Sequence, residues 1–257
     1  MDIRFPPGGI FRLVLEHIEP FIEKGNFVIS PEGLYFQSLD SAHVAMVESN
    51  FPVETFEKFK CPKRTVLGLN LTPLLKILKG VSKEETVTLR EVKDCVQCII
   101  KDATEKVLSK WTMRRLSLDY EFLDISADTY DCEVKMPTLQ FNTTLKRFAS
   151  VINGDTIHFK ITPKQMMLST SNEMDEGEII VSEDTAKDKE VTILLNIPQY
   201  TNNFSFRYLQ KFVKPQGAAS YVELLFNQDQ PLRVLYTLPS GGKLLFFLAP
   251  KTDDDEA

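Results

Sequence analysis

The segment Phe27–Ser38, FVISPEGLYFQS, has a counterpart in Phe159–Thr170, FKITPKQMMLST. Both segments begin with Phe-x-Ile, then a hydroxyl residue and Pro. A charged residue follows the Pro, and after it apolar residues alternate with other residues up to a final hydroxyl residue. Alternation on both sides of a proline turn predicts a strand, a turn and a second strand. The two segments lie 132 residues apart, so each half of the chain is expected to hold one such hairpin.

A second pair of segments repeats in the same order. Leu69–Lys79 is matched by Phe204–Lys214 at an offset of 135 residues, and each pairs a short strand with a basic helix. A repeat of this length is a whole domain and not a short solenoid repeat. Chance similarity between amphipathic segments is the alternative, and the agreement of two blocks in order disfavours it. The sequence therefore predicts two domains of one fold.

An acidic segment, Leu118–Asp131, separates the two halves. It carries five acidic residues and no basic residue, and its apolar residues follow neither a helical nor a strand period. We interpret it as an extended connector whose apolar side chains rest on another part of the protein. The expected division is two domains at 1–117 and 132–250, the connector at 118–131 and an acidic tail at 251–257.

Each half is predicted to hold two short helices among many strands, which is an α+β fold with the helices on one face of the sheets. Thr72 and Thr138 are the expected N-caps of the second and third helices, and Pro215 is expected to end the fourth. Strands are expected at 26–47, 85–116, 156–195 and 221–248.

Composition excludes several classes of protein. The first residues, MDIRFPP, lack the apolar core of a signal peptide, and no apolar run approaches the length of a membrane span, so an intracellular, soluble protein is expected. Cys95 and Cys98 lie in a strand-like run, where residues three apart point to opposite faces and do not share a metal.

No catalytic constellation is recognisable in the sequence. The histidines His17, His43 and His158 are scattered, and the chain has no phosphate-binding glycine loop, no zinc spacing and no nucleophile paired with a base. Asp40 three residues before His43 is interpreted as a turn aspartate. We therefore expect no enzyme activity, no catalytic residue, no metal and no cofactor.

Charge is distributed unevenly in this acidic chain, whose net charge is −6. The second, third and fourth predicted helices carry bases and no acid, which indicates a surface that faces a polyanion. The strand at 106–115 has four bases and no acid, and the strand at 173–184 has six acids and no base. We interpret them as equivalent strands of the two halves, suited to a head-to-tail contact between identical chains that closes into a ring.

Several motifs resemble the proliferating cell nuclear antigen family of eukaryotic sliding clamps: LDSAHV at 39–44, GLNLT at 68–72, KILK at 76–79, YDC at 130–132, VKMP at 134–137, RYL at 207–209 and LAPK at 248–251. The resemblance covers the whole chain. It implies a closed ring of three subunits around duplex DNA, with helices inside, curved antiparallel sheets outside, and 118–131 as the interdomain connector loop.

The resemblance also implies three sets of site residues. The bases facing DNA would be Arg12, Lys76, Lys79, Lys146, Arg207, Lys211 and Lys214. The pocket for a partner peptide would consist of Leu39, Val44, Met46, Leu123, Ile125, Tyr130, Pro231, Phe247, Ala249 and Pro250. The subunit interface would involve Lys110, Trp111, Arg114, Glu178, Ile179 and Val181.

The function implied is that of a nuclear processivity factor, which holds duplex DNA without reading its sequence. DNA polymerase, ligase, flap nuclease and the clamp loader would dock through a Gln-x-x-aliphatic-x-x-aromatic-aromatic peptide, and no membrane partner is expected. Two alternatives remain: a checkpoint-type clamp subunit of a mixed ring, and a protein-only scaffold without DNA binding.

Overall fold

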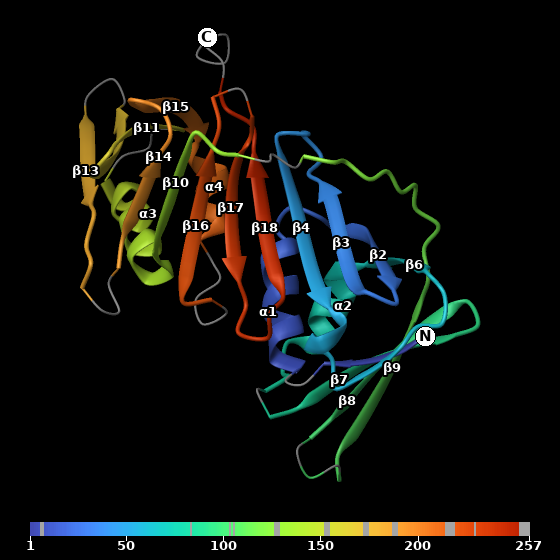
Figure 1. Ribbon diagram of the computed structural model, residues 1–257. Helices are drawn as coiled ribbons and strands as arrows, with labels where there is room; N and C mark the ends of the chain where they lie inside the picture. The colour runs from blue at the N-terminus through green and yellow to red at the C-terminus, as the bar shows by residue number, and fades with distance from the viewer. Residues whose placement is uncertain are drawn as a thin grey trace. The chain divides into compact units, whose positions relative to one another are not determined.

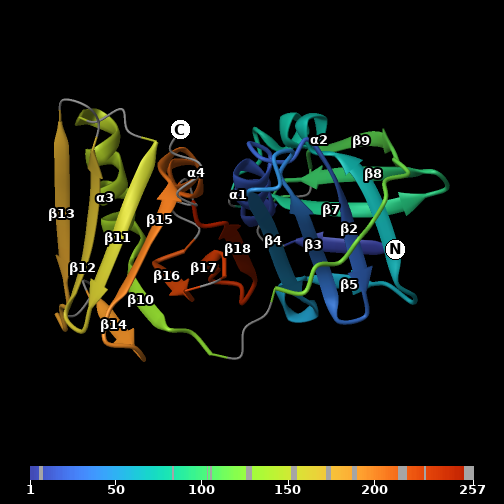
Figure 2. The ribbon, with the colours of Figure 1, turned by 90° about the horizontal axis from the view of Figure 1, so that it is seen from above.

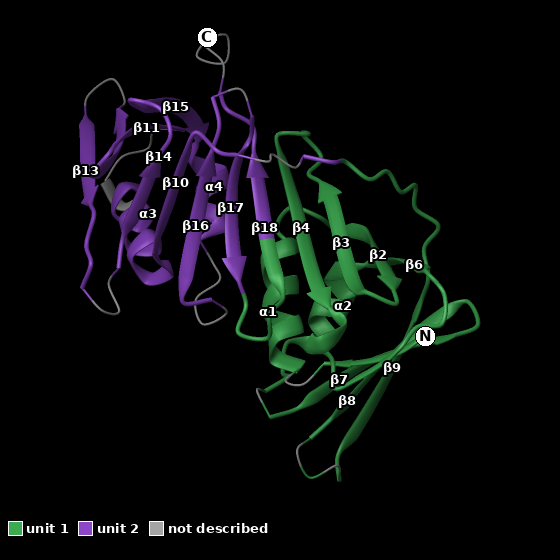
Figure 3. Ribbon diagram, viewed as in Figure 1, with its two compact units in different colours: residues 1–123, 238–244 green, residues 124–237, 245–257 purple. Residues whose placement is uncertain are grey.

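The computed structural model describes residues 1–5, 8–82, 84–102, 104, 106–125, 129–151, 155–171, 175–186, 190–213, 219–228 and 230–251, apart from the side chains of residues 150 and 151. The chain forms two compact units (Figure 3): unit 1 comprises Met1–Leu123 and Leu238–Leu244, and unit 2 comprises Asp124–Thr237 and Leu245–Ala257. Among the described helices, none has the length and apolar character needed to cross a membrane.

Unit 1 is built from two antiparallel sheets and two helices (Figure 1). One sheet has the strand order β5-β1-β7-β8-β9, and the other contains the run β4-β3-β2-β6. In chain order the elements are β1 (Asp2–Phe5), α1 (Gly8–Ile18), β2 (Lys24–Ser30), β3 (Gly33–Leu39), β4 (Ala45–Pro52), the 3-10 helix η1 (Val53–Thr55), β5 (Lys58–Lys60), β6 (Thr65–Asn70), α2 (Leu71–Leu78), β7 (Thr86–Val92), β8 (Cys95–Lys101) and β9 (Leu108–Arg114).

Unit 2 repeats this plan. Its sheets contain the runs β14-β10-β16-β17-β18 and β13-β12-β11-β15, and Figure 2 shows the second of these side by side. The elements are β10 (Cys132–Pro137), α3 (Thr138–Val151), β11 (Thr156–Thr162), β12 (Gln165–Ser171), β13 (Glu176–Ser182), β14 (Thr192–Leu195), β15 (Tyr200–Ser205), α4 (Phe206–Phe212), β16 (Tyr221–Phe226), β17 (Leu232–Thr237) and β18 (Lys243–Leu248), of which residues 245–248 belong to unit 2.

The bounds of the elements confirm the duplication. The hairpin β2–β3 begins at residues 24 and 33, and the hairpin β11–β12 begins at 156 and 165, an offset of 132 in both strands. The strand–helix pair β6–α2 begins at 65 and 71, and β15–α4 begins at 200 and 206, an offset of 135 in both elements. The two sequence blocks therefore fold into the same local structures in both halves.

The predicted equivalence of the basic and acidic strands is wrong. By the same offsets, β9, which begins at residue 108, corresponds to β18, which begins at 243. The acidic strand β13 begins at 176 and follows β12 directly, so it corresponds to β4, which begins at 45 and follows β3. The two strands were matched by opposite charge, and charge is a property of exposed side chains that does not mark position in a fold.

Helix pairs close the core of each unit by contacting both of its sheets. In unit 1, α1 packs on β1 and β7, whereas α2 packs on β2 and β6. Aromatic rings fill the space between them: Phe5 stacks on Phe11 with ring centroids 4.3 Å apart, and Phe27 lies 5.0 Å from Phe36. Buried aromatic rings contribute large apolar areas, so these contacts fix the helices to the sheets.

Both predicted helix caps differ from the structure. The N-cap of α2 is Asn70, whose Oδ1 accepts a hydrogen bond from Thr72 N at 3.0 Å, and the Thr72 hydroxyl donates to Glu19 at 3.0 Å. In α3 the buried Thr138 hydroxyl has no hydrogen-bond partner among the described residues. Asn and Thr are both good N-cap residues. Which of two nearby candidates, such as Asn70 and Thr72, becomes the cap depends on the backbone conformation at each, and the sequence does not give that conformation.

Candidate functional site

The bases on the helices form what we call the helical basic surface, described for each unit separately. It consists of Arg12, Lys76 and Lys79 in unit 1 and of Lys146, Arg147, Arg207 and Lys211 in unit 2. Arg12 and Lys211 are half-buried and the others are exposed. Helices α2, α3 and α4 contain no acidic residue. Lys214, the seventh base predicted from the resemblance, lies outside the described residues.

Two of these bases are also ion-paired. The Arg12 guanidinium lies 3.6 Å from Glu16 and donates to the carbonyl oxygen of Lys79 at 3.3 Å, so it joins α1 to the end of α2. Arg207 lies 3.6 Å from Asp155, but its side chain is 72% exposed. Exposed pairs contribute at most about 1 kcal/mol, so this carboxylate holds Arg207 weakly.

The charged strands β9 and β13 are both edge strands of their sheets. On β9, Trp111 lies opposite the buried Cys98 and therefore on the core-facing side, whereas Lys110 and Arg114 alternate to the solvent side. On β13, Ile179 lies opposite the buried Leu168, and the acidic side chains of the strand alternate to the solvent side: Glu176 and Glu178.

The predicted interface set on β13 needs one adjustment. Val181 is buried within unit 2, so its side chain belongs to the core of that unit. Ile180, which the sequence analysis did not include, is 47% exposed on the solvent side of the same strand. Together with Trp111, which is 50% exposed, it leaves apolar surface uncovered at the two edges.

A groove of ≈ 520 Å³ in unit 1 runs between the connector and strands β2 and β3. Three of the predicted pocket residues line it, namely Leu39, Met46 and Leu123. The sequence analysis missed other side chains of its wall, including Asn26, Gln37 and His43. Val44, also predicted, is half-buried and does not line this groove.

Two buried amides, Asn26 and Gln37, hold the connector and are called the amide tethers here; each is 6% exposed. The Gln37 side chain donates to the carbonyl oxygen of Leu123 at 2.8 Å and accepts from its N–H at 2.9 Å. Asn26 donates to the carbonyl oxygen of Asp119 at 2.9 Å. Residues 119–123 of the connector are therefore held against unit 1 through side-chain amides. No local sequence signal marks either amide as a tether.

The remaining predicted pocket residues belong to unit 2. Ile125, Tyr130, Pro231, Ala249 and Pro250 are half-buried, and Phe247 is buried. Arg233, absent from the prediction, donates to the Tyr130 hydroxyl at 2.8 Å and lies 5.4 Å above the Phe247 ring. This cation joins Tyr130 to Phe247, and we call these three residues the unit 2 cluster.

The cysteines of β8 and the turn aspartate Asp40, which the sequence analysis considered for metal binding or acid–base chemistry, have structural environments. Cys95 and Cys98 lie on opposite faces of β8, and burial raises the pKa of Cys98 to about 12, which keeps its thiol protonated. The Asp40 carboxylate accepts hydrogen bonds from the N–H groups of Val44 and Ala45 at 2.9 Å, as expected of a turn aspartate. Among the described residues, no cluster of His, Cys, Asp and Glu is arranged to hold a metal ion.

Duplicated α+β units, acid-free basic helices and a tethered connector together define a DNA clamp. The model of the proliferating cell nuclear antigen N-terminal domain matches residues 1–122, and the model of its C-terminal domain matches residues 124–251. The chain therefore belongs to the proliferating cell nuclear antigen family. Its members are sliding clamps that encircle DNA and bind replication and repair proteins, and they are not enzymes.

The amide tethers generate a first prediction. Gln37→Met keeps the length of the side chain and removes both hydrogen bonds to Leu123, which together contribute about 2 kcal/mol at about 1 kcal/mol each. We expect the Leu123 amide to exchange with solvent roughly thirtyfold faster, measured by hydrogen exchange and NMR. Gln165→Met, at an exposed position of β12, is the matched control. Exchange of Leu123 at the wild-type rate in the Gln37 variant would contradict the tether.

Proposed function

We propose that this chain is a nuclear sliding clamp that assembles as a homotrimer around duplex DNA and docks replication and repair enzymes through the connector. The observation that carries the proposal is that one chain has two edge strands of opposite charge, the basic β9 and the acidic β13. The resemblance supplies the number three, the eukaryotic setting and the partners: polymerase, ligase, flap nuclease and clamp loader.

The ring contact is proposed between β9 of one chain and β13 of the next. If the two edges join as one sheet, Lys110 and Arg114 meet Glu176 and Glu178 on the solvent side. Trp111 then meets Ile179 on the core-facing side. An exposed edge strand is a ready template for pairing, and a contact between two different patches of one chain is head-to-tail, which closes into a ring.

The two alternatives are less well supported. A subunit of a mixed ring would need the complementary edge on another protein, whereas this chain carries both edges itself. A protein-only scaffold would have no use for three helices that carry bases and no acids. Complementary edges favour self-assembly, and the helical basic surface favours a polyanion.

A second prediction tests the ring. Light scattering is expected to give about three times the 29.4 kDa chain mass. Lys110→Glu with Arg114→Glu places like charges at the contact and should shift the mass towards that of a monomer. Adding Glu176→Lys and Glu178→Lys restores complementarity with the charges exchanged and should recover the ring.

The control for the ring is Lys160→Glu with Lys243→Glu, which changes the net charge equally at two exposed positions on β11 and β18, strands that lie at neither edge. It should leave the mass unchanged. A wild-type monomer at micromolar concentration, or a β9 double mutant that keeps its full mass at low salt, would overturn the proposed assembly.

The helical basic surface is proposed to line the DNA channel. Lys and Arg attract phosphates without reading bases, so a closed ring is retained on DNA by its topology and still slides. Bases on helices that contain no acidic residue, as in α2, α3 and α4, suit this task because their contacts with phosphates are weak and interchangeable. Enzymes bound to the ring then stay at the template through a raised effective concentration.

A third prediction follows for the exposed bases. Replacing Lys76, Lys79 and Lys146 with Ala should leave the assembly mass unchanged and weaken association with duplex DNA. The slope of log affinity against log salt should fall by up to about 0.9 for each phosphate that the variant no longer neutralises. Fluorescence anisotropy of a labelled duplex measures this. The triple control Lys160→Ala, Lys164→Ala and Lys243→Ala removes equal charge from strands and turns, and equal effects in the two variants would refute the assignment.

The connector is proposed to receive the Gln-x-x-aliphatic-x-x-aromatic-aromatic peptide. Leu123 presents apolar surface within the unit 1 groove, and Tyr130 does so within the unit 2 cluster. Half-buried apolar side chains in an acidic segment are typical of a binding surface. Met46 in unit 1 and Phe247 in unit 2 are already buried, so each would offer a peptide little apolar surface of its own.

A fourth prediction concerns this peptide. Leu123→Ala or Tyr130→Ala should weaken a Gln-x-x-Ile-x-x-Phe-Phe peptide roughly thirtyfold, because truncating an anchor costs about 2 kcal/mol. Leu139→Ala, which removes an exposed leucine from α3, is the control and should bind normally. Calorimetry on the four proteins decides the matter, and equal affinities throughout would exclude the connector as the docking site.

A further inference from the structure

A second concentration of positive charge lies away from the helices, at the opposite end of the sheet from β9. The segment Lys58–Arg64, KFKCPKR, has four bases and no acid in a chain of net charge −6. It comprises the edge strand β5 and the turn that follows it. We call its four bases, Lys58, Lys60, Lys63 and Arg64, the basic edge.

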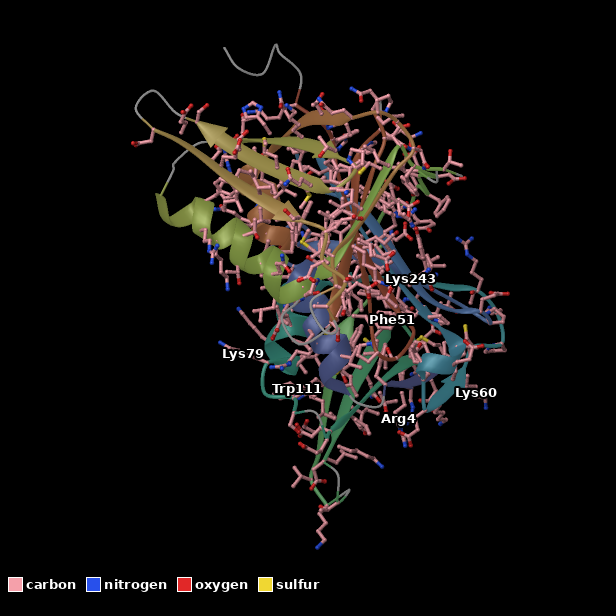
Figure 4. The ribbon with its side chains drawn as sticks, turned by 60° about the vertical axis from the view of Figure 1, so that its left-hand side comes forward. Arg4, Phe51, Lys60, Lys79, Trp111 and Lys243 are labelled. Atoms are coloured by element: carbon pink, nitrogen blue, oxygen red, sulfur yellow. The ribbon has the colours of Figure 1, made fainter. Side chains whose placement is uncertain are left out.

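Strand register extends this charge across the neighbouring strands. Asp2 of β1 lies opposite Lys60 of β5 and Arg90 of β7, and Arg4 of β1 lies opposite Lys58. Residues directly opposite in a sheet share a face, so these cations lie on one side. Figure 4 labels Arg4 and Lys60 on the same side of unit 1, away from Trp111 of β9.

The acids on this face neutralise only part of the charge. Asp2 accepts from Lys58 at 2.6 Å and from Arg90 at 3.1 Å, so one carboxylate serves two cations, and Arg4 pairs with Glu57 at 3.2 Å. Burial raises the pKa of Asp2, but the Lys58 hydrogen bond and the Arg90 charge outweigh it and lower that pKa below its ordinary value. Within the described residues, no ion pair involves Lys60.

The backbone of β5 is open as well. The strand order β5-β1-β7-β8-β9 gives β5 one neighbour, so its outer edge has no strand partner among the described residues. Phe59, between the two lysines, turns to the other face, where its ring lies 4.9 Å from that of Phe56. The edge therefore offers backbone N–H and C=O groups flanked by two solvent-facing lysines.

We propose that the basic edge binds an acidic, extended peptide segment of a partner protein, which adds to β5 as a further strand. Backbone hydrogen bonds of this kind supply affinity, and side chains at alternate positions supply specificity. Acidic residues at every second position would meet Lys58 and Lys60. Lys63 and Arg64 would attract a continuing acidic stretch and raise the rate of association.

A nucleic acid fits this edge less well. Single-stranded nucleic acids are usually held by aromatic side chains that stack on bases. The positions of this face nearest the edge are Lys58 and Lys60 of β5, Asp2 and Arg4 of β1, and Thr88 and Arg90 of β7, and none of these six is aromatic. The Tyr120 ring beside the edge already has the Arg64 guanidinium 5.8 Å from its centroid. A sugar-phosphate chain also cannot form the backbone ladder that the open edge of β5 offers. The proposal is independent of the ring, because β9 lies at the other edge of the sheet.

The experiment uses the full chain and a fluorescein-labelled peptide of alternating Asp or Glu and Val, with binding followed by anisotropy at low salt. Lys60→Glu with Lys63→Glu should weaken binding by about tenfold or more, since two attractions become repulsions. The matched control, Lys164→Glu with Lys243→Glu, carries the same change in net charge and should bind as the wild type does. An equal loss in both double mutants would overturn the proposal, because it would assign the binding to net charge.

Two further probes test how the peptide binds. A strand at an edge uses alternate amides, so two peptides that are N-methylated at alternate amides, one for each register, keep the charge and differ in hydrogen bonding. One of them should bind at least about tenfold more weakly than the unmethylated peptide. Equal binding by all three would overturn strand addition, and tighter binding of an oligothymidylate than of the peptide would assign the edge to nucleic acid.

Discussion

A backbone N–H or C=O group that leaves water needs a hydrogen-bond partner, because an unpaired one costs about 1–3 kcal/mol. In both units the antiparallel ladders meet this need over most of the described chain. The ladder ends at Leu116, whose N–H donates to the carbonyl oxygen of Gly68 at 2.8 Å. Beyond that residue the amide side chains of Asn26 and Gln37 replace a neighbouring strand. Between Asp119 and Leu123 the backbone of the connector is thus held by side chains.

The place where the chain leaves the side of β6 and enters the connector depends on a glycine, Gly68, which has no side chain. A Cβ atom at Gly68 would lie 2.3 Å from the carbonyl oxygen of Leu116, closer than two such atoms approach. Any larger residue would push Leu116 away from β6 and move the connector that follows. The wall of the groove is therefore positioned at three places along the chain, by close backbone contact at Gly68 and by the amide tethers to Asp119 and Leu123.

Local and periodic features were predictable from the sequence, and long-range polar contacts were not. The hairpins at Phe27 and Phe159 follow from alternation around a proline turn, which neighbouring residues determine. The Gln37–Leu123 pair joins residues 86 apart, and a glutamine side chain is equally suited to solvent, so nothing in the sequence marks it. The same holds for Arg233, which joins Tyr130 to Phe247. The pairing of β9 with β13 as equivalents failed because charge reports exposure and says nothing of strand order.

The position of Trp111 has a practical consequence for spectroscopy. It is the only tryptophan in the 257 residues, and it lies half-exposed on the edge strand β9. Indole emission shifts to shorter wavelength when the ring leaves water, and the other aromatic residues do not contribute to the band excited at its red edge. The intrinsic fluorescence of this protein therefore reports the solvation of one strand edge, without a label and without interference from the rest of the fold.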